Sequence, residues 1–403
     1  MNKRFKILEN EKFLGVLSRS FSFTDEPKMF NYTCSSIDKN SSLEGSASDF
    51  DEKKAKIKAL GEYVERYCLD NPTNIFKKRS YKEGVSESID PSIFLNFRNE
   101  DINGLGVEYT EKVINSKLEW VLGTNILTEK EIYLPAQLVY INHPFSEPMI
   151  RPRISTGASS HINLERALIS GIMENIERDS YVLTYFTKRK VPRVSLDGEL
   201  KGLKDYFERY KLELAVFETT TDLEIPSFMC LNLDRTGMGP AISVGLGANL
   251  NPIEAIKRSI SESQQVRQWI RYKYVAESMP NVKGPEDFRQ VEDRGYYWYP
   301  RERINELGFL LDNSSGKKSS EYKKRRIKTT KELSEFLRSK GVESYFVDIG
   351  NEITKNFGFE VVKVVQPQLQ PLFLEENLPC LEGERIRRYS GNSELNKIPH
   401  PFI

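Results

Sequence analysis

A motif of Glu, two further residues, Glu and Arg occurs twice in this chain, each time inside a helical and otherwise apolar run. The two copies lie in KIKALGEYVERY and LISGIMENIERDS and comprise Glu62, Glu65, Arg66, Glu174, Glu177 and Arg178. Residues three apart lie on one face of an α-helix, so each copy presents two carboxylates side by side. Carboxylates bind hard cations such as Mg²⁺, and guanidinium groups bind phosphate oxygens. The repeated motif therefore predicts a site for Mg²⁺ and a polyphosphate.

A single copy of the motif would be typical of a solvated helix face with intrahelical ion pairs. The repeat and its surroundings favour a site. In the second copy, Ile172, Met173 and Ile176 crowd the two glutamates. Carboxylates beside apolar surface are costly unless they are paired or metal-bound. Two such pairs facing each other would repel strongly without cations between them.

A third helix adds to this pattern. Asn251 is a typical N-cap, Pro252 occupies the first helical position, and the helix then carries Glu262, Gln265 and Arg267. Glu262 and Gln265 share a face, although a surface helix would look the same. The sequence contains no GxxxxGK[ST] and no GxGxxGxV motif. A nucleotide site, if present, is not built from the common glycine-rich loops.

Composition excludes several classes of protein. The 403 residues carry a formal net charge of +1, which argues against nucleic-acid and membrane partners. No segment is long and apolar enough to span a bilayer, and the N-terminus lacks a secretory apolar region. The four cysteines are scattered, with no CxxC pair, so a cytoplasmic location is expected. A hydrolase triad is disfavoured because GxSxG is absent, and His143 and His161 are expected in surface loops.

Strand and helix patterns alternate, which predicts a mixed α/β (α+β) fold. Residues 117–126 and 131–141 predict a hairpin, and a helix is expected from about Leu164 to Tyr181 with Asn163 as its N-cap. Further strands are expected in KLELAVFETT, IPSFMCLNL and PAISVGLGANLN. The polar, basic stretch at 313–328 is expected to be a solvated loop, with a docking role as the alternative. The aromatic cluster at 296–299 is expected in the core or at a partner surface.

Together these residues resemble the YcaO family, ATP-dependent enzymes that modify peptide backbone amides. KALGEYVER matches the family signature SxxxExxER except that Lys58 stands where Ser is frequent, and SGIMENIERD matches it with Ser170 included. The third helix resembles the family's ExxQxR segment, and the STG loop before the second signature and PQLQPLFLEENLP, a C-terminal strand and turn, are also similar. The resemblance implies a YcaO-type fold in which helices carrying the ATP and Mg²⁺ site pack on mixed sheets. It implies Mg²⁺ ligands Glu62, Glu65, Glu174 and Glu177, and ATP contacts from these and Arg66, Ser170, Arg178, Glu262, Gln265 and Arg267.

The tail refines this expectation. The chain ends Pro399-His400-Pro401-Phe402-Ile403, which is similar to the PxPxP end of azoline-forming YcaO cyclodehydratases but lacks the last proline. Pro399, Pro401 and Ile403 are therefore expected at the catalytic centre, and removal of 399–403 is expected to abolish heterocycle formation while leaving ATP binding mostly intact. The alternative without a functional role is a disordered terminus. The expected organisation is an N-terminal segment, 1–40, and a catalytic domain, 41–403.

The implied activity is ATP-dependent cyclodehydration of Cys, Ser or Thr in a ribosomally made precursor peptide, giving thiazolines or oxazolines, as in bacteriocins such as the thiazole/oxazole-modified microcins. The chain looks too short to hold its own leader-peptide-binding domain. A ThiF/E1-like leader-binding partner, a later flavin-dependent dehydrogenase and a homodimer within a larger complex are therefore expected. Two alternatives remain open: a YcaO enzyme that forms peptide thioamides, and a non-catalytic ATP-binding scaffold subunit.

Overall fold

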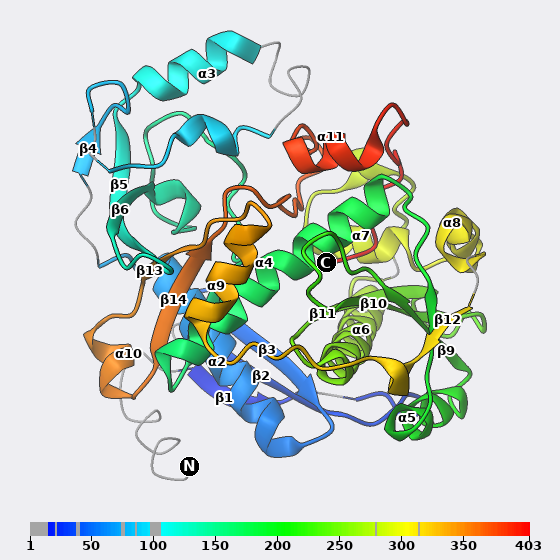
Figure 1. The fold of residues 1–403 in the computed structure, drawn as a ribbon. Coiled ribbons are helices and arrows are strands. Elements are labelled where there is room, and N and C mark those ends of the chain that lie inside the picture. The colour runs from blue at the N-terminus through cyan, green and yellow to red at the C-terminus, as the bar shows by residue number, and fades with distance from the viewer. Residues whose placement is uncertain are drawn as a thin grey trace.

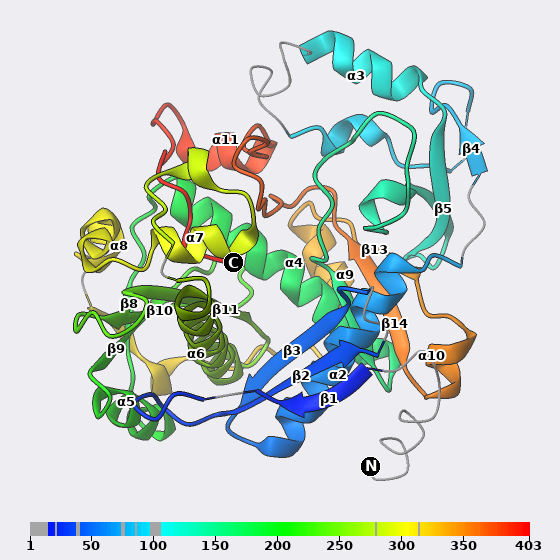
Figure 2. The same cartoon turned by 180° about the vertical axis from the view of Figure 1, so that it is seen from behind.

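The protein is described by a computed structural model that covers residues 15–20, 22–37, 41–73, 77–84, 87–96, 106–278, 280–312 and 315–403. Within these residues the chain forms three sheets with helices between and around them, a mixed α/β fold as predicted (Figures 1 and 2). Of the helices in these ranges, none combines the length and apolar character needed to cross a membrane.

The first sheet is a three-stranded antiparallel meander whose last strand leads into helix α2. Its strands are β1 (Gly15–Arg19), β2 (Phe30–Ser36) and β3 (Glu44–Asp49), and α2 is Glu52–Asp70. Asp51 caps α2 by accepting the N–H groups of Lys53 and Lys54. The domain boundary expected near residue 40 falls between the paired strands β2 and β3, so β1 and β2 belong to the same sheet as β3.

The second sheet has strand order β11-β10-β9-β8-β12, and helices α5 and α6 pack against it. Its central strands are fully buried, which explains their continuous apolar runs. Asn251 caps α6 and Pro252 is its first residue, as predicted. The elements are β8 (Arg193–Ser195), α5 (Glu199–Glu208), β9 (Leu212–Glu218), β10 (Ser227–Asp234), β11 (Ile242–Ala248), α6 (Pro252–Ala276) and β12 (Ser315–Lys318).

The third sheet has strand order β4-β5-β13-β14-β7, with β6 paired to β5. The predicted hairpin is confirmed as β5 and β6, although β6 ends early, in a 3₁₀ turn at Ala136–Leu138. PQLQPLFLEENLP was expected to begin with a strand, but β14 ends before it and 366–383 contain neither helix nor strand. The strands are β4 (Lys77–Arg79), β5 (Leu118–Asn125), β6 (Glu131–Pro135), β7 (Ala158–His161), β13 (Tyr345–Asp348) and β14 (Glu360–Val365).

Helix α4 (Leu164–Phe186) crosses the middle of the molecule (Figure 1). It packs on β14 and β7 of the third sheet and on β11 and β10 of the second, so it joins them. Asn163 is its N-cap, as predicted. The remaining helices are α3 (Gly106–Asn115), α7 (Val291–Tyr297), α8 (Gly308–Leu311), α9 (Thr330–Ser339), α10 (Glu352–Asn356) and α11 (Glu384–Ser390).

Two parts of the fold repeat one plan: an antiparallel hairpin followed by a helix that lies on its second strand. The hairpin β2–β3 precedes α2, and the hairpin β10–β11 precedes α6. Gly45 and Gly245 occupy matching positions. A Cβ on Gly45 would meet the Ala59 carbonyl oxygen at 2.6 Å, and a Cβ on Gly245 would collide with the backbone of Ser259 and Ser263. Glycine at these positions lets each helix lie directly on its strand.

We expect Gly245→Ala to destabilise the fold by roughly 1–3 kcal/mol, because the new methyl group must push α6 away from β11. Gly202→Ala is the matched control: Gly202 lies in α5 with no neighbouring atom within 4 Å of an added Cβ. It should be neutral or stabilising by up to about 1 kcal/mol. Urea denaturation of both variants measures the difference. Equal stability of the two would contradict the close packing of α6 on β11.

Candidate active site

The predicted acidic residues gather where α2, α4 and α6 meet strand ends from the three sheets. The first glutamate of the motif on each helix accepts a backbone N–H from the strand that precedes that helix or from the residue just before that strand. These hydrogen bonds are Ser46 N to Glu62 (2.9 Å), Gly157 N to Glu174 (3.1 Å) and Leu246 N to Glu262.

The second side chain on each helix, three residues later, accepts an N–H from a different strand. These hydrogen bonds are Ser160 N to Glu65 (2.6 Å), Ala248 N to Glu177 (2.9 Å) and Ser48 N to Gln265 (3.2 Å). Helix α2 is thereby tied to β7, α4 to β11, and α6 to β3. The three strand–helix units form a closed cycle. We call its six side chains, Glu62, Glu65, Glu174, Glu177, Glu262 and Gln265, the acidic ring.

The α2 side of the ring is short of positive charge. Burial, together with the neighbouring charges of Glu174 and Glu62, raises the pKa of Glu65 to about 8, although the Ser160 N–H bond lowers it. Burial also raises the pKa of Glu62, although Arg66 pairs with it at 2.7 Å. Crowded carboxylates of this kind need a cation between them.

The α6 side of the ring carries two arginines. Arg178 lies 2.9 Å from Glu177, 3.5 Å from Glu174 and 3.8 Å from Glu262. Burial raises the pKa of Glu262 to about 7 even though Arg178 lowers it. Arg258, one turn before Glu262 on α6, is exposed and lies 3.9 Å from Glu177, whose charge raises the arginine's pKa. The sequence analysis missed Arg258 because an arginine on an amphipathic helix looks like ordinary surface.

The donor set of the ring fits Mg²⁺ and a polyphosphate. Each glutamate uses one oxygen for a backbone N–H, which fixes the carboxylate, and the second oxygen of Glu62 accepts from Arg66 at 2.7 Å. The second oxygen of Glu177 lies 2.9 Å from Nη1 of Arg178 without hydrogen-bond geometry, and Nε of Arg178 is buried with no hydrogen-bond partner among the described residues. Among the described residues, no three acidic, His or Cys side chains are placed to hold a metal alone. Mg²⁺ commonly takes only one or two carboxylates and completes its shell with phosphate oxygens and water.

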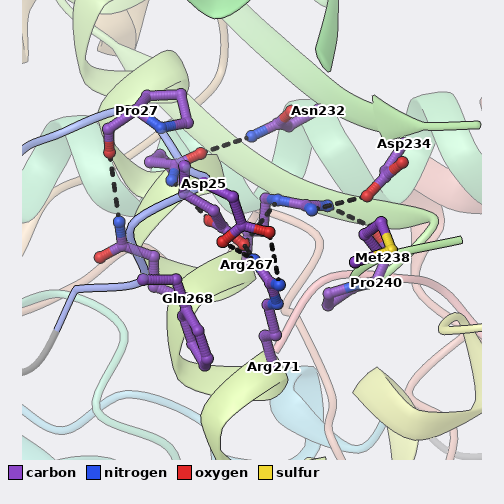
Figure 3. A network of polar contacts seen from close by, with 12 residues as sticks. Asp25, Pro27, Asn232, Asp234, Met238, Pro240, Arg267, Gln268 and Arg271 are labelled. Atoms are coloured by element: carbon purple, nitrogen blue, oxygen red, sulfur yellow. Dashed lines mark hydrogen bonds and ion pairs between the residues drawn. The ribbon is translucent and has the colours of Figure 1, made fainter. Parts of the chain in front are cut away.

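The structure does not bring Arg267 into the ring. Its guanidinium is buried, donates to Asp234 at 2.6 Å and to the Pro240 carbonyl at 2.7 Å, and lies 3.3 Å from Glu26 (Figure 3). Arg271 binds Asp25 and Glu26 in the same network. These pairs fasten the segment before β2 to α6. The position of Arg267 does not support the expected ATP contact.

Other expected contacts are spread around the ring. Gln265 also donates to the Ser46 carbonyl at 3.0 Å, so both ends of its amide are engaged with β3. Ser170 lies on α4, one turn before Glu174. Lys58 pairs with Asp49 at 2.7 Å. Gln265 is therefore a link between β3 and α6.

The C-terminal tail is ordered and buried beside α4. The Pro399 carbonyl accepts hydrogen bonds from the Tyr185 hydroxyl (3.1 Å) and from Trp298 Nε1 (3.2 Å). Pro401 is buried, and Ile403 packs beside Val266, Ile270 and Tyr296. The alternative of a disordered terminus is wrong.

The histidines differ from expectation in part. His161 ends strand β7, opposite Glu360 of β14, instead of lying in a loop. His143 lies in a loop but is partly buried and bonded to Glu119 at 2.8 Å. Burial and Arg294 lower the pKa of His400 well below its usual value. A neutral, enclosed His400 does not suit proton transfer. The aromatic cluster at 296–299 is largely buried, as expected for the core.

A family model described as YcaO cyclodehydratase, ATP- and Mg²⁺-binding, matches residues 48–370. The chain belongs to the YcaO family. It is therefore an ATP-dependent enzyme that uses Mg²⁺. A YcaO relative, an uncharacterized protein of Methanothermobacter thermautotrophicus, is 27% identical over 350 residues, 83% of this chain and 82% of that protein.

Solved structures share the YcaO fold. A heterocyclase in complex with substrate and cofactor aligns with a TM-score of 0.77 and 20% identity over 99% of this chain and 57% of its own. YcaO from Methanopyrus kandleri, bound with AMPPCP and Mg²⁺, aligns with a TM-score of 0.68 and 19% identity. The alignment covers 92% of this chain and 90% of that protein. A chain of the E. coli microcin synthetase McbBCD complex aligns with a TM-score of 0.68 and 14% identity. The alignment covers 95% of this chain and 96% of that one. This chain thus spans little more than half of the first heterocyclase and nearly all of the other two.

The raised pKa of Glu65 predicts a pH-dependent cost to the metal-free fold. Unfolding returns this carboxyl to a pKa near 4.5, so between 4.5 and about 8 the folded protein holds a proton that the unfolded chain has lost. This contribution to stability falls as the pH rises. Glu65→Gln removes the titrating carboxyl, and with it this pH-dependent contribution, but keeps an oxygen that accepts from the Ser160 N–H. In EDTA, the melting temperature of the variant relative to wild type should increase from about pH 6 to about pH 9. A constant difference would contradict the raised pKa. Lys363, which titrates in the opposite sense, is common to both proteins.

The ring also predicts a specific role for Gln265. Gln265→Met frees β3 from α6 and should weaken Mg²⁺–ATP binding, because Glu62 is held by the same strand. Gln268→Met is the matched control: it breaks two hydrogen bonds, to Asn31 and Pro27, one turn further along α6. Both should lose about 1–3 kcal/mol of stability. Calorimetric titration should show weaker nucleotide binding only for Gln265→Met. An equal loss of affinity in both variants would contradict the role of the ring.

Proposed function

We propose that this enzyme is a peptide cyclodehydratase, which forms thiazolines or oxazolines from Cys, Ser or Thr of a ribosomally made precursor. The observation that carries the proposal is the placement of the PHPFI tail against the acidic ring. Phe402 lies 4.2 Å from the guanidinium carbon of Arg178, so the chain end and the second signature meet at one place. A proline-bearing tail in this position favours azoline formation over the thioamide and scaffold alternatives.

The proposed chemistry explains the need for ATP. An amide oxygen is a poor leaving group. ATP would phosphorylate the oxygen of the adduct formed when the substrate side chain attacks the preceding carbonyl, and phosphate would then leave. We assign metal binding to Glu62, Glu65, Glu174 and Glu177: Glu62 and Glu65 lie where carboxylates outnumber cations, and Glu174 and Glu177 lie next to Arg178. Arg178 and Arg258, with Ser170, Glu262 and Arg66 at the margins, would orient the polyphosphate and offset its charge.

The roles of the tail follow from its anchoring. Proline restricts the backbone of a segment, and the Tyr185 and Trp298 hydrogen bonds fix the Pro399 carbonyl. Pro399, Pro401 and Ile403 are proposed to hold the chain end at a fixed depth near the reacting amide. His400 is enclosed by aromatic rings. We do not assign the base that deprotonates the substrate thiol or hydroxyl to it.

The partners belong to the same proposal. A precursor peptide is the proposed substrate, and a ThiF/E1-like protein is proposed to bind its leader. A flavin-dependent dehydrogenase would oxidise azolines to azoles after this enzyme has acted. The solved structure from the McbBCD complex shows that a protein of this fold and similar length works within an assembly. The catalytic domain is proposed to include residues 41–403, in a homodimer within such an assembly in the cytoplasm.

Glu177→Gln is expected to reduce phosphate release and product formation at least about a hundredfold, because a buried ligand near the phosphates loses its charge. Glu254→Gln is the control, since Glu254 is exposed on α6 and contacts Lys257. Phosphate release is measured with precursor and partner present, and the peptide product is weighed. Loss of one water molecule for each thiazoline or oxazoline formed supports the proposal. Exchange of oxygen for sulfur would instead establish thioamide formation, and equal phosphate release by both variants would indicate a scaffold.

A further inference from the structure

The guanidinium of Arg178 lies over the ring of Phe402 inside the protein. The guanidinium carbon lies 4.2 Å from the ring centroid, and the two residues are 4% and 9% exposed. The ring of Tyr181, one turn along α4, lies 5.6 Å from that of Phe402. A desolvated cation over an aromatic face is a strong form of this contact.

The contact leaves the edge of Arg178 available. A guanidinium donates its hydrogen bonds in its own plane, so a ring stacked on its face does not occupy them. Nε of Arg178 has no hydrogen-bond partner among the described residues, Nη1 lies 2.9 Å from Glu177 without hydrogen-bond geometry, and Nη2 stays 3.5 Å and 3.8 Å from Glu174 and Glu262. A buried guanidinium whose donors are not fully used is arranged to receive a further anion.

The C-terminal tail is anchored just before Phe402, which restricts movement of the Phe402 side chain. The Pro399 carbonyl accepts from two side chains, and the His400 carbonyl accepts from Arg294 Nη1 at 3.0 Å. His400 Nε2 bonds to the Phe373 carbonyl at 2.9 Å, and its ring meets Tyr181, Tyr185, Phe186 and Phe373 edge-on. Phe402 follows two residues after the last of these anchors. Its position is set before any nucleotide arrives.

We propose that Phe402 is a positioning residue for nucleotide: it holds the plane of Arg178 so that the free guanidinium edge points at the phosphates. The proposal rests on the proposed function only in assigning phosphate to the acidic ring. Without the aromatic face, the guanidinium can turn until Nη1, which now lies 2.9 Å from Glu177 without hydrogen-bond geometry, donates to that carboxylate, and phosphate must then break this bond. The tail would then contribute to ATP affinity itself, which revises the expectation that its removal leaves ATP binding mostly intact.

The test is binding of Mg²⁺ with a non-hydrolysable ATP analogue, measured by calorimetry without peptide. Phe402→Leu and Phe402→Met keep an apolar side chain but lose the aromatic face, and each should bind about tenfold more weakly. Phe402→Tyr retains the face and should stay within about twofold of wild type. Phe207→Leu, a substitution of a buried residue in α5, outside the acidic ring, controls for lost stability. Melting temperatures are recorded for every variant.

A double-mutant cycle separates positioning from packing. In an Arg178→Met background, Phe402→Leu should cause no further loss of affinity, because the group that it positions is absent. Wild-type affinity in Phe402→Leu and Phe402→Met, or an equal loss in the Arg178→Met background, overturns the proposal. Failure of the proposed function gives a different result: the analogue still binds with this dependence on Phe402, but the peptide product shows no loss of water.

Discussion

Hydrogen bonds from strand N–H groups to glutamates on neighbouring helices hold the site of this enzyme together. A carboxylate that accepts a backbone N–H is fixed at one oxygen, so the fold itself sets the positions of the side chains proposed to bind metal and nucleotide. The bonds also run between units, since α2 reaches β7, α4 reaches β11 and α6 reaches β3. The same contacts therefore stabilise the fold and set the spacing of the ligands.

Bringing the carboxylates of the acidic ring together costs free energy, which explains why arginines lie beside them. Several carboxylates brought together lose hydration and repel, which is why the pKa values of Glu65 and Glu262 are raised to about 8 and 7. Arginines supplied from α4 and α6 relieve one side, and the other side remains acidic. In the proposed function, this uneven distribution of charge would orient a Mg²⁺–polyphosphate ligand with its metal toward α2 and its phosphate oxygens toward Arg178 and Arg258. The buried network of Arg267 and Arg271 contributes differently, by fastening the N-terminal segment to α6.

The sequence predicts part of this arrangement well. The spacing of Glu62 and Glu65, and of Glu174 and Glu177, identified the helix faces correctly because the α-helical repeat is local. Caps at Asn163 and Asn251 followed from the same kind of local rule. Arg267 was misplaced because its neighbour Gln265 faces the ring, while a position two residues later on a helix points elsewhere. The N–H partners on β3, β7 and β11 could not be predicted, since they depend on how the three sheets meet around α4.

The matched hairpin–helix units have a further consequence. Within each unit, the second strand, the helix and a glycine at the crossing, Gly45 or Gly245, place the first glutamate of the motif, Glu62 or Glu262. The connecting stretches between the units lie outside these contacts. Insertions or deletions there should be tolerated more readily than a single added methyl at a crossing. Related proteins are thus free to acquire different partner-binding loops while the catalytic geometry stays constant.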